Sequence, residues 1–401
     1  MLLISVVFLI SHVLLTWRAW VRARRITLVS ALTLGAVMFA LGSSWLLYRP
    51  HSLGTFRAED MGWVTEQFLI ASFLGLLVMV AEHGHLQRLG PHGNQRMIST
   101  VWLRRAVLLA GGLAALRLAQ SGIDLAVVAG DDRSTVREGA PIVVAVLGYL
   151  MPLAAIFFAH ASGTIKNRWT IGTLAASLSV IVVGFRGLAL TGLLALAVVA
   201  VHLGHRPNRR VLAAIGLGST GILAAMSALR PQASSGLYSA LMNRAFYTSA
   251  YQIEKVRELA GEQPYPGSWL VRDLAARIGS NEATLQQAVW RADFGDGSDI
   301  GGSYSVIGDL IGNFGAAWWV AYAMLLLLLL WWDVSGVFAL HRFGRLINSC
   351  LLVVTARVAV FGLAAALTPL ALIGFAWVVG VRGRRRAPNP LAPALVVQRA
   401  R

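Results

Sequence analysis

Apolar stretches of bilayer-spanning length recur along this chain, separated by short runs of basic residues. A transmembrane helix needs about 20 mostly apolar residues, because the hydrocarbon core is about 30 Å thick and a helix rises about 1.5 Å per residue. Hydrophobic residues make up 57% of the 401 residues and charged residues only 13%, against about 25% charged in a typical soluble domain. The sequence therefore predicts an all-α polytopic membrane protein, organised as a single membrane domain over residues 1–401.

About eleven transmembrane helices follow from this pattern. The first segment lacks a basic leader and a small-residue cleavage site, so it is expected to remain as a helix. The expected spans are residues 1–17, 26–48, 67–82, 106–129, 140–161, 170–185, 187–204, 211–229, 314–332, 346–365 and 367–381.

Basic residues gather in alternate connecting segments, as the positive-inside rule requires of real spans. One set of segments carries nineteen basic residues, whereas the short loops of the other set carry four arginines offset by six acidic residues. We expect a multi-pass inner (plasma) membrane protein, and the alternation places its N-terminus outside and its C-terminus in the cytoplasm. The net charge of +17 belongs to these juxtamembrane runs, so membrane lipids are expected partners and nucleic acid is not. The nineteen are Arg18, Arg22, Arg24, Arg25, Arg88, Arg96, Arg104, Arg105, Lys166, Arg168, Arg206, Arg209, Arg210, Arg342, Arg345, Arg382, Arg384, Arg385 and Arg386.

One long segment, residues 230–304, falls on the outer side and has the composition of a soluble domain. It contains seven basic and eight acidic residues. Apolar residues at helical spacing predict two amphipathic helices, separated by the turn Gln263-Pro264-Tyr265-Pro266-Gly267. Long connections are usually functional or disordered, and this one is too rich in aromatic residues for disorder. We expect a periplasmic loop subdomain that carries part of the functional site.

Two motifs border that loop. In Gly184-Phe185-Arg186-Gly187, an arginine lies at the outer end of one span between small residues, where its guanidinium could meet a phosphate or could reach toward lipid headgroups. The stretch from Gly301 to Gly315 leads from the loop into the ninth span. A helix from about Ser305 places Gly308, Gly312 and Gly315 on one face. It also aligns Ser305, Asp309 and Asn313 in a polar stripe, in which Asp309 is either a general base or a structural carboxylate that pairs with an arginine.

Other polar residues are weaker candidates. Asn243-Arg244-Ala245-Phe246-Tyr247 opens the amphipathic part of the loop and is followed by Tyr251 and Gln252; a single loop arginine is more often simply solvated. Arg117 and Arg357 fall inside predicted spans, where a charge is a functional candidate by default, although Arg117 could pair with Asp124. His83, His85 and His92 have no acidic or cysteine partners nearby and Cys350 is the only cysteine, so no metal and no cofactor is predicted.

Together these residues resemble a family. The outer-edge G-x-R-G, the N-R-x-F at the start of a long outer loop, and the terminal G-x-S-x-x-x-I-G-[DE]-x-x-x-N-F-G are similar to motifs of the Wzy-type O-antigen and exopolysaccharide repeat-unit polymerases. The similarity runs from Gly184 to Gly315 in order. The chain departs from the commoner pattern in having Asp309 where glutamate is usual, and Leu310 and Ile311 where an aromatic residue is often found.

The resemblance implies a metal-independent membrane glycosyltransferase with the all-helical fold of such enzymes. It would transfer a growing glycan on undecaprenyl diphosphate onto the next lipid-linked repeat unit, alongside a flippase and a possible chain-length regulator of the same pathway. Arg186 and Arg244 match the family's arginines and would bind the diphosphates. Our own hypothesis from the residues is that Asp309 deprotonates or orients the attacking sugar hydroxyl and that Tyr304, Ser305 and Asn313 position it. The other residues expected to bind substrate are Arg117, Arg357, Tyr251 and Gln252.

Three alternatives stay open. An O-antigen ligase shares the architecture and the use of arginines but donates the glycan to lipid A core. A lipid or oligosaccharide transporter or flippase is favoured by the intramembrane Arg117, Asp124 and Arg357, although the chain shows no repeat of two related halves. A purely structural membrane scaffold is the third.

Overall fold

Helices are the only regular elements in the part of the chain that the structure describes. The computed structural model describes residues 1–48, 58–87, 100–120, 141–179, 186–202, 248–261, 265–277, 283–294, 305–337, 344–363 and 365–374. Within these ranges six helical stretches are long and apolar enough to cross a membrane, namely Leu2–Ala23, Leu28–Tyr48, Asp60–His85, Ile142–Ser162, Val306–Gly336 and Gly344–Phe361. The prediction of an α-helical multi-pass membrane protein is thereby confirmed. The number eleven stays a prediction, and the expected eighth span at 211–229 lies outside the described residues.

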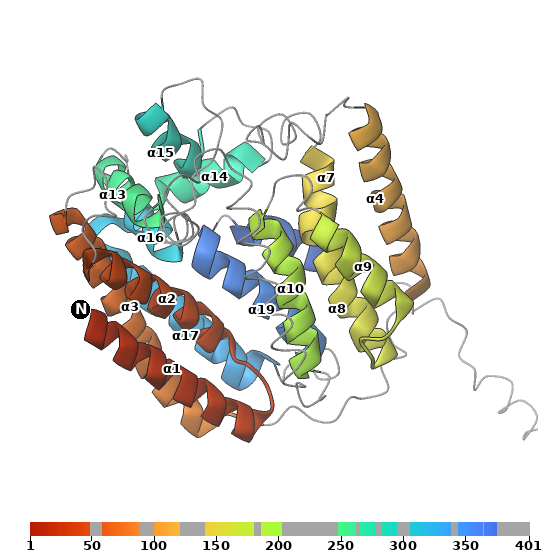
Figure 1. Cartoon of the computed structure of the whole chain (residues 1–401), viewed down its shortest axis with the longest axis horizontal. Helices are drawn as coiled ribbons and strands as arrows, with labels where there is room; N and C mark the ends of the chain where they lie inside the picture. Colours follow the sequence, from red (N-terminus) through yellow and green to blue (C-terminus); the bar gives the residue numbers. More distant parts are fainter. Residues whose placement is uncertain are drawn as a thin grey trace, which may run out of the picture.

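The first half of the bundle is built around α2 (Leu28–Tyr48), which packs against α1 (Leu2–Ala23), α3 (Ala58–His85) and α17 (Trp318–Trp331) (Figure 1). Helices in lipid gain little from the hydrophobic effect and associate through close contact of small residues. Gly75 of α3 lies directly against Thr33 of α2, and Gly35 of α2 lies against Ala359. Any larger residue at either glycine would push the helices apart.

The second half contains α4 (Thr100–Gln120), α7 (Pro141–Ala145), the π-helical turn η2 (Val146–Leu150), α8 (Met151–Ser162), α9 (Arg168–Ser179) and α10 (Arg186–His202). α8 is buried along most of its length, whereas α4 is peripheral and buries only Val107 and Ala114. The long helix α19 (Gly344–Phe361) contacts α2, α8 and α10. It therefore joins the two halves (Figure 1).

Three short helices lie together at one end of the bundle (Figure 1). They are α13 (Thr248–Ala260), α14 (Ser268–Arg277) and α15 (Leu285–Phe294), which we call the cap. The loop was expected to hold two amphipathic helices; the cap has three, because a further helix follows α14. The predicted turn precedes α14, and Gly267 there has a φ of 83°, a conformation that glycine adopts at no steric cost.

The cap rests on α16 (Val306–Phe314), and α16 begins where the sequence predicted a helix. Gly312 allows this contact, since a Cβ at that position would lie 2.7 Å from Leu285 Cδ2 and 2.9 Å from Val256 Cγ1. The expectation for Gly315 was wrong. It has a φ of 54° and ends α16, so it does not share the helix face of Gly308 and Gly312. The chain continues through the short 3-10 turn η5 (Gly315–Ala317) into α17.

Candidate functional site

The predicted polar stripe of α16 is buried at the junction between the cap and the membrane helices. Ser305, Asp309 and Asn313 are each at most 2% exposed. The hydroxyl of Ser305 has no hydrogen-bond partner among the described residues. A buried polar atom without a partner is costly, so the Ser305 hydroxyl has hydrogen-bonding capacity that the described residues leave unused.

Asn313 connects the stripe to the cap. Its backbone oxygen accepts the N–H of Gly267 at 2.7 Å, and its Oδ1 accepts the N–H of Leu270 at 2.7 Å. Its Nδ2 donates to the backbone oxygen of Asp309 at 2.9 Å. The buried side chain of Asn313 thus supplies an acceptor for a backbone N–H in the first turn of α14 and holds that turn against α16. Asn313 positions the cap, which is a more specific role than sequence spacing could indicate.

Asp309 lies against the end of α19. Its Oδ2 accepts the backbone N–H of Leu363, which lies two residues before the apolar helix Ala365–Gly374. Gly362 makes the approach possible, because a Cβ there would clash with the Asp309 carboxylate. The Asp309 carboxylate therefore fixes the turn between α19 and the helix that follows it. The base role stays a prediction.

Arg357 of α19 is a predicted site residue whose charged side chain the fold buries inside a membrane-spanning helix. Its side chain is 5% exposed. Nη1 donates to Thr191 Oγ1 of α10 at 2.6 Å, and Nη2 donates to Tyr149 Oη of η2 at 3.3 Å. The guanidinium also lies over the rings of Tyr149, at 4.5 Å, and Phe361, at 5.4 Å. Hydroxyls and aromatic faces hold a buried cation in a defined position.

The contact with Thr191 ties Arg357 to the start of α10. Arg186 is the first residue of that helix, and five residues of α-helix span about 7.5 Å. The backbone of Arg186 therefore lies about one and a half turns along α10 from Thr191, the residue that binds Arg357. The side chain of Arg186, together with Arg244 and Tyr304, lies outside the described residues.

The remaining predicted residues are more scattered. Gln252 is buried and Tyr251 half-buried in α13, where Lys255 Nζ lies 5.9 Å from the Tyr251 ring. Arg117 is exposed on the peripheral helix α4, and Asp124, its possible partner, is outside the described residues. Asp309 contacts Leu363 and Arg357 contacts Phe361, so both residues reach the end of α19, whereas Arg117 is exposed on α4.

Sequence alone had not singled out Tyr149, Thr191 or Gly362. The sequence did show a glycine at position 362, inside the predicted span 346–365. In the structure this glycine ends α19 and has a φ of 86°. Tyr149 stands on a π-helical turn, a feature frequent at functional sites. Neither Tyr149 nor Thr191 could be recognised without knowing which helices meet Arg357.

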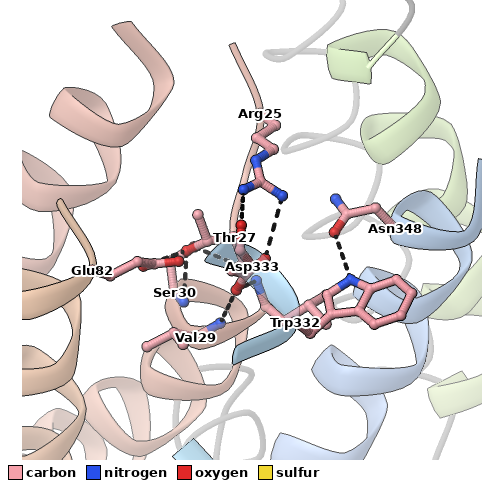
Figure 2. A network of polar contacts seen from close by, with 9 residues as sticks. Arg25, Thr27, Val29, Ser30, Glu82, Trp332, Asp333 and Asn348 are labelled. Carbon is pink, nitrogen blue, oxygen red and sulfur yellow. Dashed lines mark hydrogen bonds and ion pairs between the residues drawn. The ribbon is translucent and has the colours of Figure 1, made fainter. Parts of the chain in front are cut away.

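A second buried polar cluster lies at the opposite end of the bundle, where α1 turns into α2 (Figure 2). Arg25, Glu82 and Asp333 are each at most 1% exposed. Arg25 Nη2 donates to the backbone oxygen of Asp333, and its Nη1 lies 3.7 Å from Asp333 Oδ1. Asp333 belongs to the π-helical turn η6 (Trp332–Gly336). We call this set, with Thr27, the inner cluster; the sequence had indicated only that Arg25 belongs to a basic loop.

The inner cluster also fixes the start of α2. Asp333 Oδ2 accepts the N–H groups of Leu28 at 2.7 Å and Val29 at 3.2 Å. Thr27 Oγ1 accepts the N–H of Ser30 and donates to Glu82 Oε2 at 3.1 Å. A carboxylate that accepts the first N–H groups of a helix is a strong cap. The ion pair and these hydrogen bonds therefore connect three segments that are distant in sequence, namely the start of α2, the end of α3 and η6.

Comparison of the chain with protein-family models, with curated proteins and with solved structures found no match. Among the described residues, no three His, Cys, Asp or Glu side chains gather closely enough to hold a metal ion. The functional interpretation therefore depends on the two buried sites and on the sequence motifs.

Proposed function

We propose that this protein is a membrane glycosyltransferase that polymerises undecaprenyl-diphosphate-linked oligosaccharide at the outer face of the bacterial inner membrane. The observation that carries the proposal is Arg357, a buried arginine held by Thr191 and Tyr149 beneath the cap. It lies near the start of α10, which is where the G-x-R-G motif places Arg186. Lipid diphosphates present their charge at the membrane surface, and arginine binds phosphate oxygens in a bidentate manner.

The chemistry is a single displacement at the sugar. The acceptor hydroxyl attacks the anomeric carbon of the lipid-linked glycan, and a new glycosidic C–O bond forms. The bond from that carbon to the diphosphate oxygen breaks, and undecaprenyl diphosphate leaves with the electron pair. Arg186, Arg244 and Arg357 would stabilise the charge that develops on the leaving group, and the Asp309 carboxylate would take the hydroxyl proton.

Support for this arrangement comes from the position of the α16 stripe. Ser305, Asp309 and Asn313 lie between the cap and α19, and Asp309 reaches the turn that follows Phe361, the residue on which Arg357 is stacked. Asp309 as the base and Arg357 as the diphosphate-binding cation would therefore both face the junction between the cap and α19. Binding the substrate there would require the cap to admit a glycan from the outer side.

Reconstitution with lipid-linked repeat units tests the proposal. Wild-type protein in proteoliposomes should convert single repeats into a ladder of polymer, and Arg186→Ala, Arg244→Ala and Arg357→Gln should each abolish it. Arg18→Gln, an exposed arginine at the other end of the bundle, is the matched control and should keep the ladder. Full-length polymer from the arginine variants of the site would overturn the proposal.

Asp309→Asn tests the base separately, because asparagine retains an oxygen to accept the Leu363 N–H but cannot take a proton. Undiminished single-turnover transfer by this variant would exclude Asp309 as the base. A deletion strain distinguishes polymerase from ligase: loss of a polymerase leaves single repeats on the cell surface, whereas loss of a ligase leaves long polymer on undecaprenol.

A transporter or flippase is the second candidate, and the inner cluster is the observation that favours it. Ionisable residues buried within membrane helices are characteristic of proton relays in transporters. Against this, the cluster's bonds to Leu28, Val29 and Thr27 serve the folding of α2. In the same proteoliposomes, movement of labelled lipid-linked repeats across the bilayer without a change in their length would favour transport.

A further inference from the structure

We call the end of the bundle at which α1 turns into α2 and α4 and α9 begin the basic end (Figure 1). One corner of this end combines four basic side chains with two tryptophans. The guanidinium of Arg104 lies 5.2 Å from the centre of the Trp169 ring, and that of Arg105 lies 5.4 Å from the Trp102 ring. Arg104 and Arg105 belong to the first turns of α4, and Lys166, Arg168 and Trp169 surround the start of α9. Trp and Arg together are typical of the membrane–water interface. We call this set the basic corner.

No carboxylate of the surrounding sequence balances this charge. The chain contains no Asp or Glu between residues 83 and 123, and none between residues 139 and 253. These two stretches include the whole of α4 and of α7, η2, α8, α9 and α10, so the helices that α4 contacts most closely carry no acidic residue. The basic corner therefore has a net positive charge that its own neighbourhood in the fold leaves uncompensated.

Two N–H donors in the corner lack acceptors among the described residues. They are Arg104 Nε and Trp169 Nε1, and both atoms are buried. A buried donor without an acceptor costs about 1–3 kcal/mol. An anionic oxygen that enters between the Arg104 and Trp169 side chains would supply the missing acceptor and would meet the arginine charge at the same place.

The surface above the corner is apolar. α4 buries Val107 and Ala114, while Leu108, Leu109, Leu113 and Leu116 are at least 46% exposed. A ligand that combines an anionic head with an apolar tail matches a basic corner that continues into such a surface. Basic pockets between transmembrane helices on the cytoplasmic side bind the headgroups of anionic lipids.

We propose that the basic corner is a binding site for the headgroup of an anionic phospholipid. The phosphate is bound by Arg104, Arg105 and Arg168, and the acyl chains run along α4. The bound lipid holds the thinly packed α4 against α8 and α9. The site is separate from the cap end, so it stands whether or not the chain is a glycosyltransferase.

The experiment measures thermal unfolding of the full-length protein in a neutral detergent through the thiol of Cys350. This cysteine is the only one in the chain and is fully buried, so a thiol-reactive fluorophore reports its exposure. Phosphatidylglycerol should raise Tm above the value with phosphatidylcholine at equal lipid content. Inorganic phosphate at the same concentration should leave Tm unchanged, because it has no acyl chains.

Two double variants make the test specific. Arg105→Gln with Arg168→Gln removes two exposed side chains, so it should fold normally and lose most of the phosphatidylglycerol shift. Arg104→Gln with Arg105→Gln should lose it entirely. Arg257→Gln is the matched control, since Arg257 lies 4.6 Å from the Trp63 ring at the cap end; it should keep the full shift.

Three results would overturn the proposal. The first is an equal shift with phosphatidylcholine, which would indicate a general need for lipid. The second is an equal shift with inorganic phosphate, which would indicate an ion site. The third is a full phosphatidylglycerol shift in both double variants, which would place the lipid elsewhere on the basic end.

Discussion

Removing the charge of Asp333 should destabilise the protein more than any other single change at the basic end. Asp333 is fully buried beside Arg25 and accepts the first two N–H groups of α2. Taking one partner from a buried ion pair leaves the other uncompensated and costs about 3–5 kcal/mol. Loss of a helix cap costs about a further 1 kcal/mol. We therefore expect about 3–5 kcal/mol for Asp333→Asn, which keeps an oxygen to cap α2, and about 1 kcal/mol more for Asp333→Ala.

Glu82→Gln is the matched control. Glutamine keeps an oxygen to accept the Thr27 hydroxyl, so it preserves the hydrogen bond between Thr27 and residue 82. Only one arginine stands beside the two carboxyls, so this variant leaves an Arg25–Asp333 pair of balanced charge. Its cost should stay under about 1 kcal/mol. Arg25→Met combined with Asp333→Asn should cost less than the sum of the two single variants, because the two side chains interact directly.

The assay is again the reaction of Cys350 with a thiol-reactive fluorophore during heating. Each kcal/mol corresponds to roughly 2–4 °C in a domain of 150–250 residues and to less in a larger one, so Asp333→Asn should lower Tm by on the order of 5 °C. Membrane proteins often unfold irreversibly, so all variants are compared at one scan rate. If Asp333→Asn lowers Tm no more than Glu82→Gln does, the Arg25–Asp333 pair does not hold α2 in place and the reasoning is refuted.

Three further predictions concern the cap. Asn313→Leu removes the acceptor of the Leu270 N–H and should cost about 1–3 kcal/mol; hydrogen exchange should then quicken at Leu270, and unchanged protection there would contradict the docking role of Asn313. Gly312→Val places carbon atoms against Leu285 and Val256 and should cost about 1–3 kcal/mol through overpacking. The loss of stability should appear as faster proteolysis within α13 and α15. The exposed position Gly172 has open space around it and should tolerate alanine. Burial raises the pKa of Glu254, with Asp60 and Glu258 adding to the effect and Lys255 opposing it. A carboxyl whose folded pKa is raised stabilises the fold below its unfolded value of 4.5 and loses that contribution as the pH rises through the folded value. Protection of α13 from exchange should therefore decrease over this window in the wild type and lose that pH dependence in Glu254→Gln; an identical pH profile in both would contradict it.

Much of the architecture follows from the sequence, because lipid imposes simple requirements on a chain. A segment without charges must be helical to satisfy its backbone in hydrocarbon, so α2 lies within its predicted span and α8 ends one residue beyond its own, whereas α1 continues to Ala23, past the predicted end at residue 17. Local signals were also sufficient for the turn at Gly267 and for the start of α16, since both depend on residues close together in the chain. The third cap helix and the end of α16 at Gly315 were not predicted, because tertiary contacts and a single positive φ decided them.

The polar sites depend on contacts that no local pattern contains. Arg357 and Thr191 are 166 residues apart, Arg357 and Tyr149 are 208 apart, and Arg25 and Asp333 are 308 apart. The sequence could mark Arg357 as a charge in an apolar span, because such a charge is costly wherever it lies. Which hydroxyls, rings and carboxyls surround it was decided by the packing of α19 against α10, η2 and α16. The sequence thus determined which segments enter the membrane and which charges had to find partners there; only the tertiary structure, by bringing distant helices into contact, decided which partners they found.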